Sequence, residues 1–263
     1  MISIPSIVTP VSHLFSNDDF ARRIIDKSDY LECRDRSFNF GDGRQLLFHC
    51  DFQPIHNLSD KFFLYLEKIK KIKKELKLIS FHVASSCDRP KLINGMFEEG
   101  GVSYNENDMF KNAEKNFSII KKIFGDDVEV AIENNNFYPT SAYNFVTEPE
   151  FINTIARNSN LKILFDIAHA KVTSVNKNID YEDYKGQIDF DRVIQLHICK
   201  HGIRDDGFAF DAHDAPDQDL YDEVLSILNT SSNIKYLTIE FYKDIEILLP
   251  VLEKFNNIKN YVK

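Results

Sequence analysis

Several features that would place a chain in a special class are missing from these 263 residues. No apolar stretch approaches the roughly 20 residues that a membrane-spanning helix needs, which argues against a membrane protein. Only four cysteines occur, Cys33, Cys50, Cys87 and Cys199, and no two of them have C-x-x-C spacing. They fit reduced thiols in a cytoplasmic protein better than a disulfide framework. Tryptophan is absent, which excludes nothing.

Positive charge is also scarce. The 32 lysines and arginines face 41 acidic residues, so the formal net charge is −9. Such a surface repels nucleic acid and anionic membranes, and we expect neither as a partner. The basic run from Lys68 to Lys77 keeps its apolar residues at helical spacing and is interpreted as the solvated face of a helix. The first residues, MISIPSIVTPVSHLF, lack a basic n-region and a clear cleavage site, so we expect no signal peptide.

Strand and helix signals alternate along the chain. Short runs rich in β-branched and aromatic residues predict eight strands, at residues 2–8, 29–34, 45–50, 76–83, 127–134, 161–166, 192–198 and 234–241. Helical spacing of apolar residues predicts helices at 18–27, 59–74, 107–124, 148–158, 216–228 and 244–255. Asn17 and Ser59 are the expected N-caps of the first two helices. The segment between the second and third strands is short and contains Gly41 and Gly43, which favours a loop there.

This alternation implies a parallel sheet covered by helices. Eight such units in a chain of this length predict a (β/α)8 TIM barrel, with room for one irregular βα unit. No low-complexity segment or flexible linker divides the chain, and a hydrophobic content of 43% supplies a core. We therefore predict a single TIM-barrel domain over residues 1–263.

Nine acidic and imidazole residues fall at or just past the ends of apolar runs. They are His49, His82, Glu133, Asp166, His169, His197, Asp211, His213 and Glu240. A parallel barrel brings its strand ends to one rim, where imidazoles and carboxylates together suit divalent metals. Carboxylates that close apolar runs, as Glu133 and Glu240 do, are costly to bury unless they are paired or bound to a metal. One histidine at a strand end is ordinarily a core residue, but independent burial does not explain nine ligand-type residues in such places.

Local spacing supports this grouping. Asp166 ends its strand and His169 follows in the turn, so both can reach the same rim. Asp211 and His213 are two residues apart and point the same way if that segment is extended. Cys199 is interpreted as a buried, inert thiol.

Five segments in order resemble the multinuclear non-heme iron-dependent oxidative enzymes (MNIO). They are IENNNFYPTSAYNFVTEPEFI, LFDIAHAKVTSVN, DRVIQLHI, FDAHDAPDQDLYDEV and LTIEF. Before Glu133 the resemblance rests mainly on LLFHCD and SFHVAS. It implies a xylose-isomerase-like TIM barrel that holds two or three irons of mixed valence and uses dioxygen. It also implies a ribosomally made precursor peptide as substrate, often modified at cysteine, and a partner protein that recognises the peptide's leader.

Carried over residue by residue, the resemblance makes the nine rim residues iron ligands, with Glu133 and Glu240 as bridging carboxylates. The residues implied for catalysis are Glu133, Asp166, His213 and Glu240. Asn134 would lie beside the ligands or face the substrate. Apart from the resemblance, His201 and Arg204 belong to a polar loop over the expected rim and are candidates for the same two roles. Their loop, CKHGIRDDG, departs from the small residue or glycine that relatives carry after the histidine, and a solvated βα loop is its simpler interpretation. His13 and His56, in loops near the same rim, are given no role.

Three alternatives remain open at this point. A trinuclear-zinc endonuclease of the abasic-site type uses a similar ligand order, and zinc accepts the same side chains as iron. Such an enzyme should have a basic groove, which an acidic chain without basic rim loops does not suggest. A divalent-metal sugar isomerase or epimerase would need fewer histidines and a lysine or a carboxylate pair for proton transfer. In a third interpretation, a metal cluster only stabilises the barrel.

Overall fold

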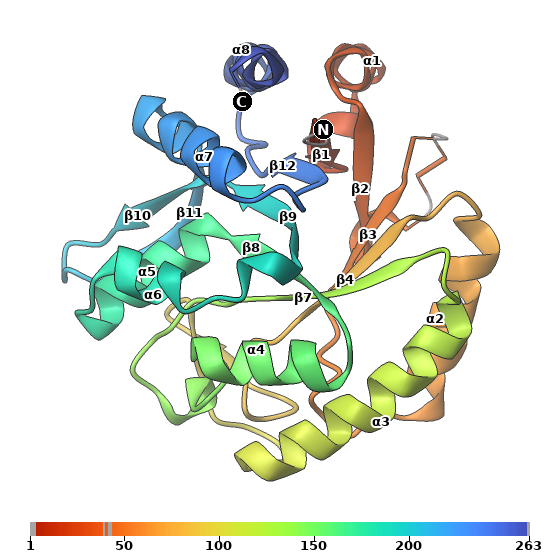
Figure 1. Ribbon diagram of the computed structural model, residues 1–263, viewed down its shortest axis with the longest axis vertical. Helices are drawn as coiled ribbons and strands as arrows, with labels where there is room; N and C mark the ends of the chain where they lie inside the picture. Colours follow the sequence, from red (N-terminus) through yellow and green to blue (C-terminus); the bar gives the residue numbers. More distant parts are fainter. Residues whose placement is uncertain (1–3, 39, 42–43, 262–263) are drawn as a thin grey trace.

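The computed structural model describes residues 4–38, 40–41 and 44–261. Within these ranges the barrel strands are β1 (Ser6–Pro10), β2 (Tyr30–Arg34), β3 (Leu47–Cys50), β4 (Leu78–His82), β7 (Glu129–Glu133), β8 (Lys162–Asp166), β9 (Val193–Ile198) and β12 (Tyr236–Ile239). All eight are parallel and close in the order β1-β12-β9-β8-β7-β4-β3-β2 (Figure 1). The predicted barrel is confirmed, and each predicted strand has a counterpart. Ile2, Ser3 and Gly43, which entered those predictions, lie outside the described residues.

Eight α-helices occur in the described part of the chain. They are α1 (Asp18–Lys27), α2 (Asp60–Ile72), α3 (Glu106–Phe124), α4 (Pro149–Asn158), α5 (Ile167–Lys177), α6 (Tyr181–Gly186), α7 (Gln218–Thr230) and α8 (Ile245–Asn256). Six lie where apolar spacing predicted them. Asn17 caps α1 as expected by accepting from the backbone N–H groups of Asp19 and Phe20, whereas the side chain of Ser59 makes no capping bond. No helix in the described ranges is both long and apolar enough to cross a bilayer.

The sequence analysis missed helices α5 and α6. All but one of the first eight residues of α5, from Ile167 to Ser174, are buried, so they show no polar face to mark a helical period. Asp166 is its N-cap and Asn178, at φ 54°, ends it in the left-handed region. The prediction that His169 lies in a turn is therefore wrong, because His169 belongs to the first turn of α5.

The unit between β2 and β3 is irregular, as predicted. Its described residues form only a short 3-10 helix at Asp35–Ser37 instead of an α-helix. The carboxylate of Asp35 accepts hydrogen bonds from the Tyr65 hydroxyl at 2.5 Å and the Asp51 backbone N–H at 2.7 Å. These bonds fix the loop, so Arg34 and Arg36 stand at the rim on either side of Asp35.

Two antiparallel hairpins, not predicted from the sequence, follow barrel strands at the rim. The first joins β5 (Lys91–Ile93) to β6 (Met96–Glu98), and the second joins β10 (Lys200–Ile203) to β11 (Ala209–Asp214). Asn94 and Gly95 turn the first hairpin with φ values of 51° and 77°, the left-handed pair that an Asn-Gly hairpin turn uses. Residues of both hairpins line the cavity described in the next subsection.

Candidate metal centre

The alternation of side chains along the barrel strands explains how the predicted ligands meet. An apolar layer of Val8, Leu47, Leu78, Ala131, Leu164, Ile194 and Tyr236 fills the barrel interior. Two residues beyond Leu47, Ala131 and Leu164 along their strands come His49, Glu133 and Asp166. Because residues i and i+2 share a face, these side chains also point inward, one layer nearer the rim. Strand register pairs His82 with Glu133 and Asp166 with His197.

Glu133 lies at the middle of this upper layer. Its Oε2 atom is 2.9 Å from Nδ1 of His82 and 3.5 Å from Nε2 of His49. Its Oε1 atom is 3.1 Å from Nδ1 of His197 and 3.8 Å from Nδ1 of His169. One buried carboxylate thus faces four imidazoles from four different parts of the chain.

The remaining predicted ligands extend the same cluster. Oε2 of Glu240 is 3.3 Å from Nδ1 of His197 and 3.7 Å from Nε2 of His213. Oδ2 of Asp211 is 3.2 Å from Nδ1 of His213 and 3.5 Å from Nε2 of His169. The structure therefore brings all nine residues together. Asp211 and His213 both lie on β11 and reach the cluster, although the φ of His213, 46°, departs from a regular strand.

Hydrogen bonds on the far side of three imidazoles set which nitrogen faces the cluster. Nδ1 of His49 lies 2.8 Å from Oγ of Ser80, and Nδ1 of His169 lies 2.9 Å from the Asn134 carbonyl oxygen. Nε2 of His197 lies 3.1 Å from Oε2 of Glu32. Such partners hold the ring and leave the other nitrogen to bind a metal. The inward nitrogens are then Nε2 of His49 and His169 and Nδ1 of His197.

Asn134 is placed behind the ligands and away from the substrate side. It is fully buried, and its side-chain amide forms hydrogen bonds with both backbone groups of Asp166. Its Oδ1 accepts from the Asp166 N–H at 2.7 Å and its Nδ2 donates to the Asp166 carbonyl at 2.9 Å. Asn134 therefore supports two ligands, Asp166 and His169.

Glu32 and Arg34, both on β2, belong to the site but were missed. Glu32 is fully buried, and its Oε2 accepts from Nε2 of Gln195 at 2.6 Å. Arg34 forms ion pairs with Oε1 of Glu32 at 2.9 Å and with Oε1 of Glu240. The signal was a carboxylate flanked by Leu31 and Cys33, both buried, which leaves only the barrel interior for its side chain.

Burial and neighbouring charges shift the pKa values of groups in this cluster in both directions. Burial raises the pKa of Asp166 well above its usual value, and the neighbouring carboxylates of Glu240 and Glu133 add to the rise. Burial also acts against ionised Glu133, but His49 and His82 outweigh it and hold the pKa of Glu133 well below normal. Burial lowers the pKa of His49 to about 3, so this imidazole is neutral near pH 7 and can serve as a ligand.

The donor set fits a group of cations. Glu133 Oε2, Asp166 Oδ2 and His197 Nδ1 are buried polar atoms that make no hydrogen bond of suitable geometry among the described residues, although imidazole–carboxylate contacts of 2.9 Å and 3.1 Å reach Glu133 Oε2 and His197 Nδ1. Leaving such an atom unpaired costs on the order of 1–3 kcal/mol, and all three belong to the inward-facing cluster.

In the described ranges, four sets of three residues bring ligand atoms within 4.8 Å of one another. The sets are His49, His82 and Glu133; Glu133, Asp166 and His169; Glu32, His197 and Glu240; and Cys199, His213 and Glu240. Oxygen and nitrogen donors dominate, as iron and zinc both accept.

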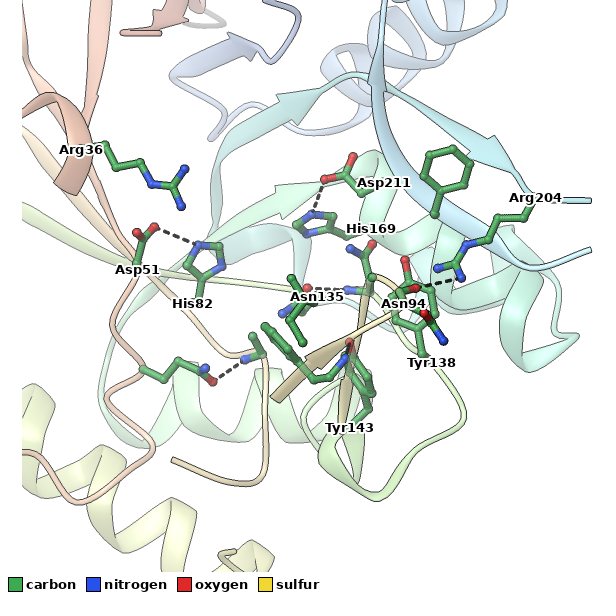
Figure 2. Close-up of a pocket in the computed structure, with 17 residues that line it drawn as sticks. Arg36, Asp51, His82, Asn94, Asn135, Tyr138, Tyr143, His169, Arg204 and Asp211 are labelled. Carbon is green, nitrogen blue, oxygen red and sulfur yellow. Dashed lines mark hydrogen bonds and ion pairs between the residues drawn. The ribbon is translucent and has the colours of Figure 1, made fainter. Parts of the chain in front are cut away.

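A cavity of about 730 Å³ opens onto the cluster (Figure 2). His82, His169 and Asp211 reach its surface, beside Arg36, Asp51 and residues of both hairpins, Arg204 among them. A second cavity of about 570 Å³ lies on the other side of Arg36 and Asp51, which line both, and includes Arg34, His13 and Tyr242. These two adjoining cavities, which share Arg36 and Asp51, are together called the trough.

Two other histidines lie away from this trough. His201 is half-buried on β10 and lines neither cavity. His56 is buried, with its Nε2 atom 2.8 Å from the Ser85 carbonyl oxygen and its ring stacked on Tyr104. Both fit structural roles.

A closed parallel barrel with imidazoles and carboxylates at its rim defines the xylose-isomerase-like class of TIM barrels. A D-tagatose 3-epimerase-like protein superimposes with a TM-score of 0.62 at 15% identity, over 97% of this chain and 98% of that one. A xylose isomerase-like TIM barrel protein from Mycobacterium smegmatis, in complex with magnesium, gives 0.62 at 6% identity over 98% of each chain. At these identities the likeness shows the fold alone.

The particular family follows from the sequence. The chain belongs to the RiPP precursor modification enzymes MbnB/TglH/ChrH, whose family model matches residues 59–263. Its resemblance to the multinuclear non-heme iron-dependent oxidative enzymes is thereby confirmed.

Curated relatives share shorter segments. A UPF0276 protein of Nitrosospira multiformis is 27% identical over 100 residues, which is 38% of this chain and 34% of the relative. One from Neisseria meningitidis serogroup C is 31% identical over 87 residues, or 33% of this chain and 31% of the relative. The chain spans about a third of the length of these two relatives.

Proposed function

We propose that this protein is an iron-dependent, dioxygen-using oxidase. Its substrate is a ribosomally made precursor peptide, and the residue that it modifies is a cysteine. The observation that carries the proposal is the set of buried, inward-facing ligand atoms that make no hydrogen bond among the described residues, in a chain that belongs to the RiPP precursor modification family. A leader-recognising partner protein and a cytoplasmic location are parts of the same proposal.

Two or three irons would be held by the nine rim residues, with Glu133 and Glu240 as the carboxylates shared between metals. Each of these two carboxylates lies within 4 Å of more than one imidazole, which supports that role. Bound iron supplies redox chemistry with dioxygen and an acidic site for a thiolate. We assign catalytic roles to Glu133, Asp166, His213 and Glu240.

The chain's own contribution is positioning and exclusion of water. Glu32, Ser80 and the Asn134 carbonyl hold three imidazoles in the orientation that exposes one nitrogen. Arg34 offsets part of the carboxylate charge from the β2 side. The trough has Asp211 and His169 in its wall, so a peptide segment bound there would lie beside the ligands.

The alternatives are less well supported. The residues that line the two cavities include arginines but no lysine, the residue expected for proton transfer in a sugar isomerase unless a carboxylate pair does it. The cavities are lined by three arginines, and Arg34 is already paired with Glu32 and Glu240, which leaves only Arg36 and Arg204 to contact a DNA backbone.

Metal analysis with Mössbauer spectroscopy on protein purified anaerobically tests the proposal. Two or more irons per chain with a coupled signal support it, and a precursor peptide should then change mass only when iron and dioxygen are both present. Stoichiometric zinc after expression in iron-rich medium, with nicking of abasic DNA, would instead establish the endonuclease-like alternative.

A further inference from the structure

The cavity beside the cluster contains a cation that no described acidic side chain neutralises. Arg204 lies between the strands of the second hairpin and lines this cavity. No acidic side chain of the described residues lies within ion-pair distance of its guanidinium, although the chain has 41 acidic residues. Asp205 and Asp206 follow it directly in sequence, yet Oδ1 of Asp206 accepts from the Phe208 N–H at 3.1 Å instead.

Arg204 is nevertheless held in place. Its Nη1 donates to the Asn94 carbonyl oxygen at 3.2 Å, which links the tips of the two hairpins. Its guanidinium carbon lies 5.5 Å from the ring centre of Tyr138 and 5.9 Å from that of Phe210. A Cβ atom on Gly95 would lie 3.6 Å from Nη2 of Arg204, an ordinary van der Waals contact, so the hairpin turn packs beside the guanidinium. An arginine packed in this way has lost its side-chain entropy before any ligand arrives.

Most of its hydrogen-bonding capacity remains unused. A guanidinium offers five N–H donors in a planar fork, and the described residues engage it through the Asn94 carbonyl oxygen and the Tyr138 hydroxyl. The fork matches a carboxylate, which can accept two parallel hydrogen bonds from it. Figure 2 shows Arg204 and Arg36 on opposite sides of the cavity, with His82 and His169 between them.

We propose that Arg204 binds a carboxylate of the peptide substrate and so fixes which residue reaches the metal cluster. This inference rests on the proposed function, because the peptide is its ligand. The carboxylate has two possible sources, the C-terminal α-carboxylate of the peptide or an acidic side chain next to the modified residue. In either case Arg204 is a specificity-determining residue on the wall opposite Arg36.

Binding of four short peptides to the iron-loaded protein without dioxygen tests this assignment. The first pair is N-acetyl-Gly-Cys with a free C-terminus and its C-terminal amide. The second pair is N-acetyl-Cys-Asp-amide and N-acetyl-Cys-Asn-amide. We expect the acid of one pair to bind at least about tenfold more tightly than its neutral analogue, and that pair identifies the source of the carboxylate.

The Arg204→Gln variant should bind acid and neutral peptides about equally, and Arg204→Lys should retain part of the preference. Arg22→Gln is the matched control, because it removes the same charge from exposed helix α1. If Arg204 only held the two hairpins together, its loss would weaken both members of a pair alike and leave their ratio unchanged. That result overturns the proposal, as does a wild-type protein that binds acid and neutral peptides equally or binds neither.

Iron content and peptide modification are measured on the same preparations. Iron-loaded, active protein with no acid preference would refute the role of Arg204 and leave the proposed function standing. If no iron is taken up, the proposed function fails, while the same four titrations on the metal-free protein still decide whether Arg204 selects a carboxylate.

Discussion

Glu32 and His197 form a buried carboxylate–imidazole pair in which Oε2 of Glu32 lies 3.1 Å from Nε2 of His197. The other ring nitrogen, Nδ1, faces Glu133 at 3.1 Å and Glu240 at 3.3 Å. Burial opposes a charge on Glu32, but His197 and Arg34 outweigh it and lower the pKa of Glu32 to about 2. Glu32 is therefore ionised at neutral pH and fixes the His197 ring with its Nδ1 atom toward the cluster.

Glu32→Gln should weaken metal binding by about 10- to 100-fold, the usual effect of losing the partner behind a metal-binding histidine. Competition with a chelator measures the change. Glu129→Gln is the control, because Glu129 pairs with Lys235 at 2.8 Å at the start of β7, far from the rim. Unchanged metal affinity in Glu32→Gln would show that the pair does not orient His197.

Asp166 combines two tasks that substitution can separate. Its Oδ1 caps α5 by accepting from the His169 N–H at 2.7 Å, while its Oδ2 has no hydrogen-bond partner among the described residues. Asparagine caps helices as well as aspartate, so Asp166→Asn should keep the stability of the metal-free protein within about 0.5 kcal/mol, whereas Asp166→Ala should lose about 1 kcal/mol. Both variants should lose metal. Denaturant unfolding and metal analysis measure the two effects, and full metal loading of Asp166→Asn would contradict the assignment.

Packing in the second hairpin predicts a longer-range effect on the cluster. A Cβ atom on Gly202 would lie 2.6 Å from the Phe210 ring and 3.2 Å from the Ala212 side chain. Gly202→Ala should displace β11, which carries Asp211 and His213, and cost about 1–3 kcal/mol. Metal content and thermal unfolding test this. Gly186→Ala, with nothing within 4 Å of the added atom, should leave both unchanged.

The pH dependence of stability should reveal His56. Burial lowers the pKa of His56, against opposing effects of the Ser85 hydrogen bond and Asp88. The unfolded chain, with a histidine pKa of about 6.5, then takes up a proton before the folded protein does. Stability therefore falls as the pH drops below about 6.5, at no more than roughly 1.4 kcal/mol per pH unit for one group.

His56→Gln keeps a donor for the Ser85 carbonyl and removes this titration. Denaturant unfolding of metal-free protein between pH 7.5 and pH 5.5 compares the two chains. We expect the difference between them to shift in favour of His56→Gln as the pH falls. A constant difference across the range would show that His56 has no part in acid sensitivity.

The sequence predicted the strand ends well, because alternating strand and helix signals locate them and a barrel gathers them. That is why all nine ligand-type residues could be named beforehand. It is harder to predict from sequence which residues of a strand point into the barrel. On β2, Leu31 and Cys33 are buried on one face, so the Glu32 side chain has to point inward. The contacts that Glu32 makes there are seen only in the closed barrel. The rim hairpins were missed because their strands are three to six residues long and nearly all of their residues are exposed or half-buried. Helix α5 was missed because burial hides its helical period.

The barrel closes where β1 pairs with β12, and helices α1 and α8 meet outside this seam, joined by Lys27 and Glu253 at 3.0 Å (Figure 1). The cluster lies across the same seam. Arg34 on β2 holds Glu240, directly after β12, while the other carboxylates come from the middle of the chain. A metal bound there would hold together the strands on the two sides of this seam. Part of its binding free energy would therefore stabilise the closed barrel. Chelation should then loosen this seam before it affects β4 and β7 on the opposite wall.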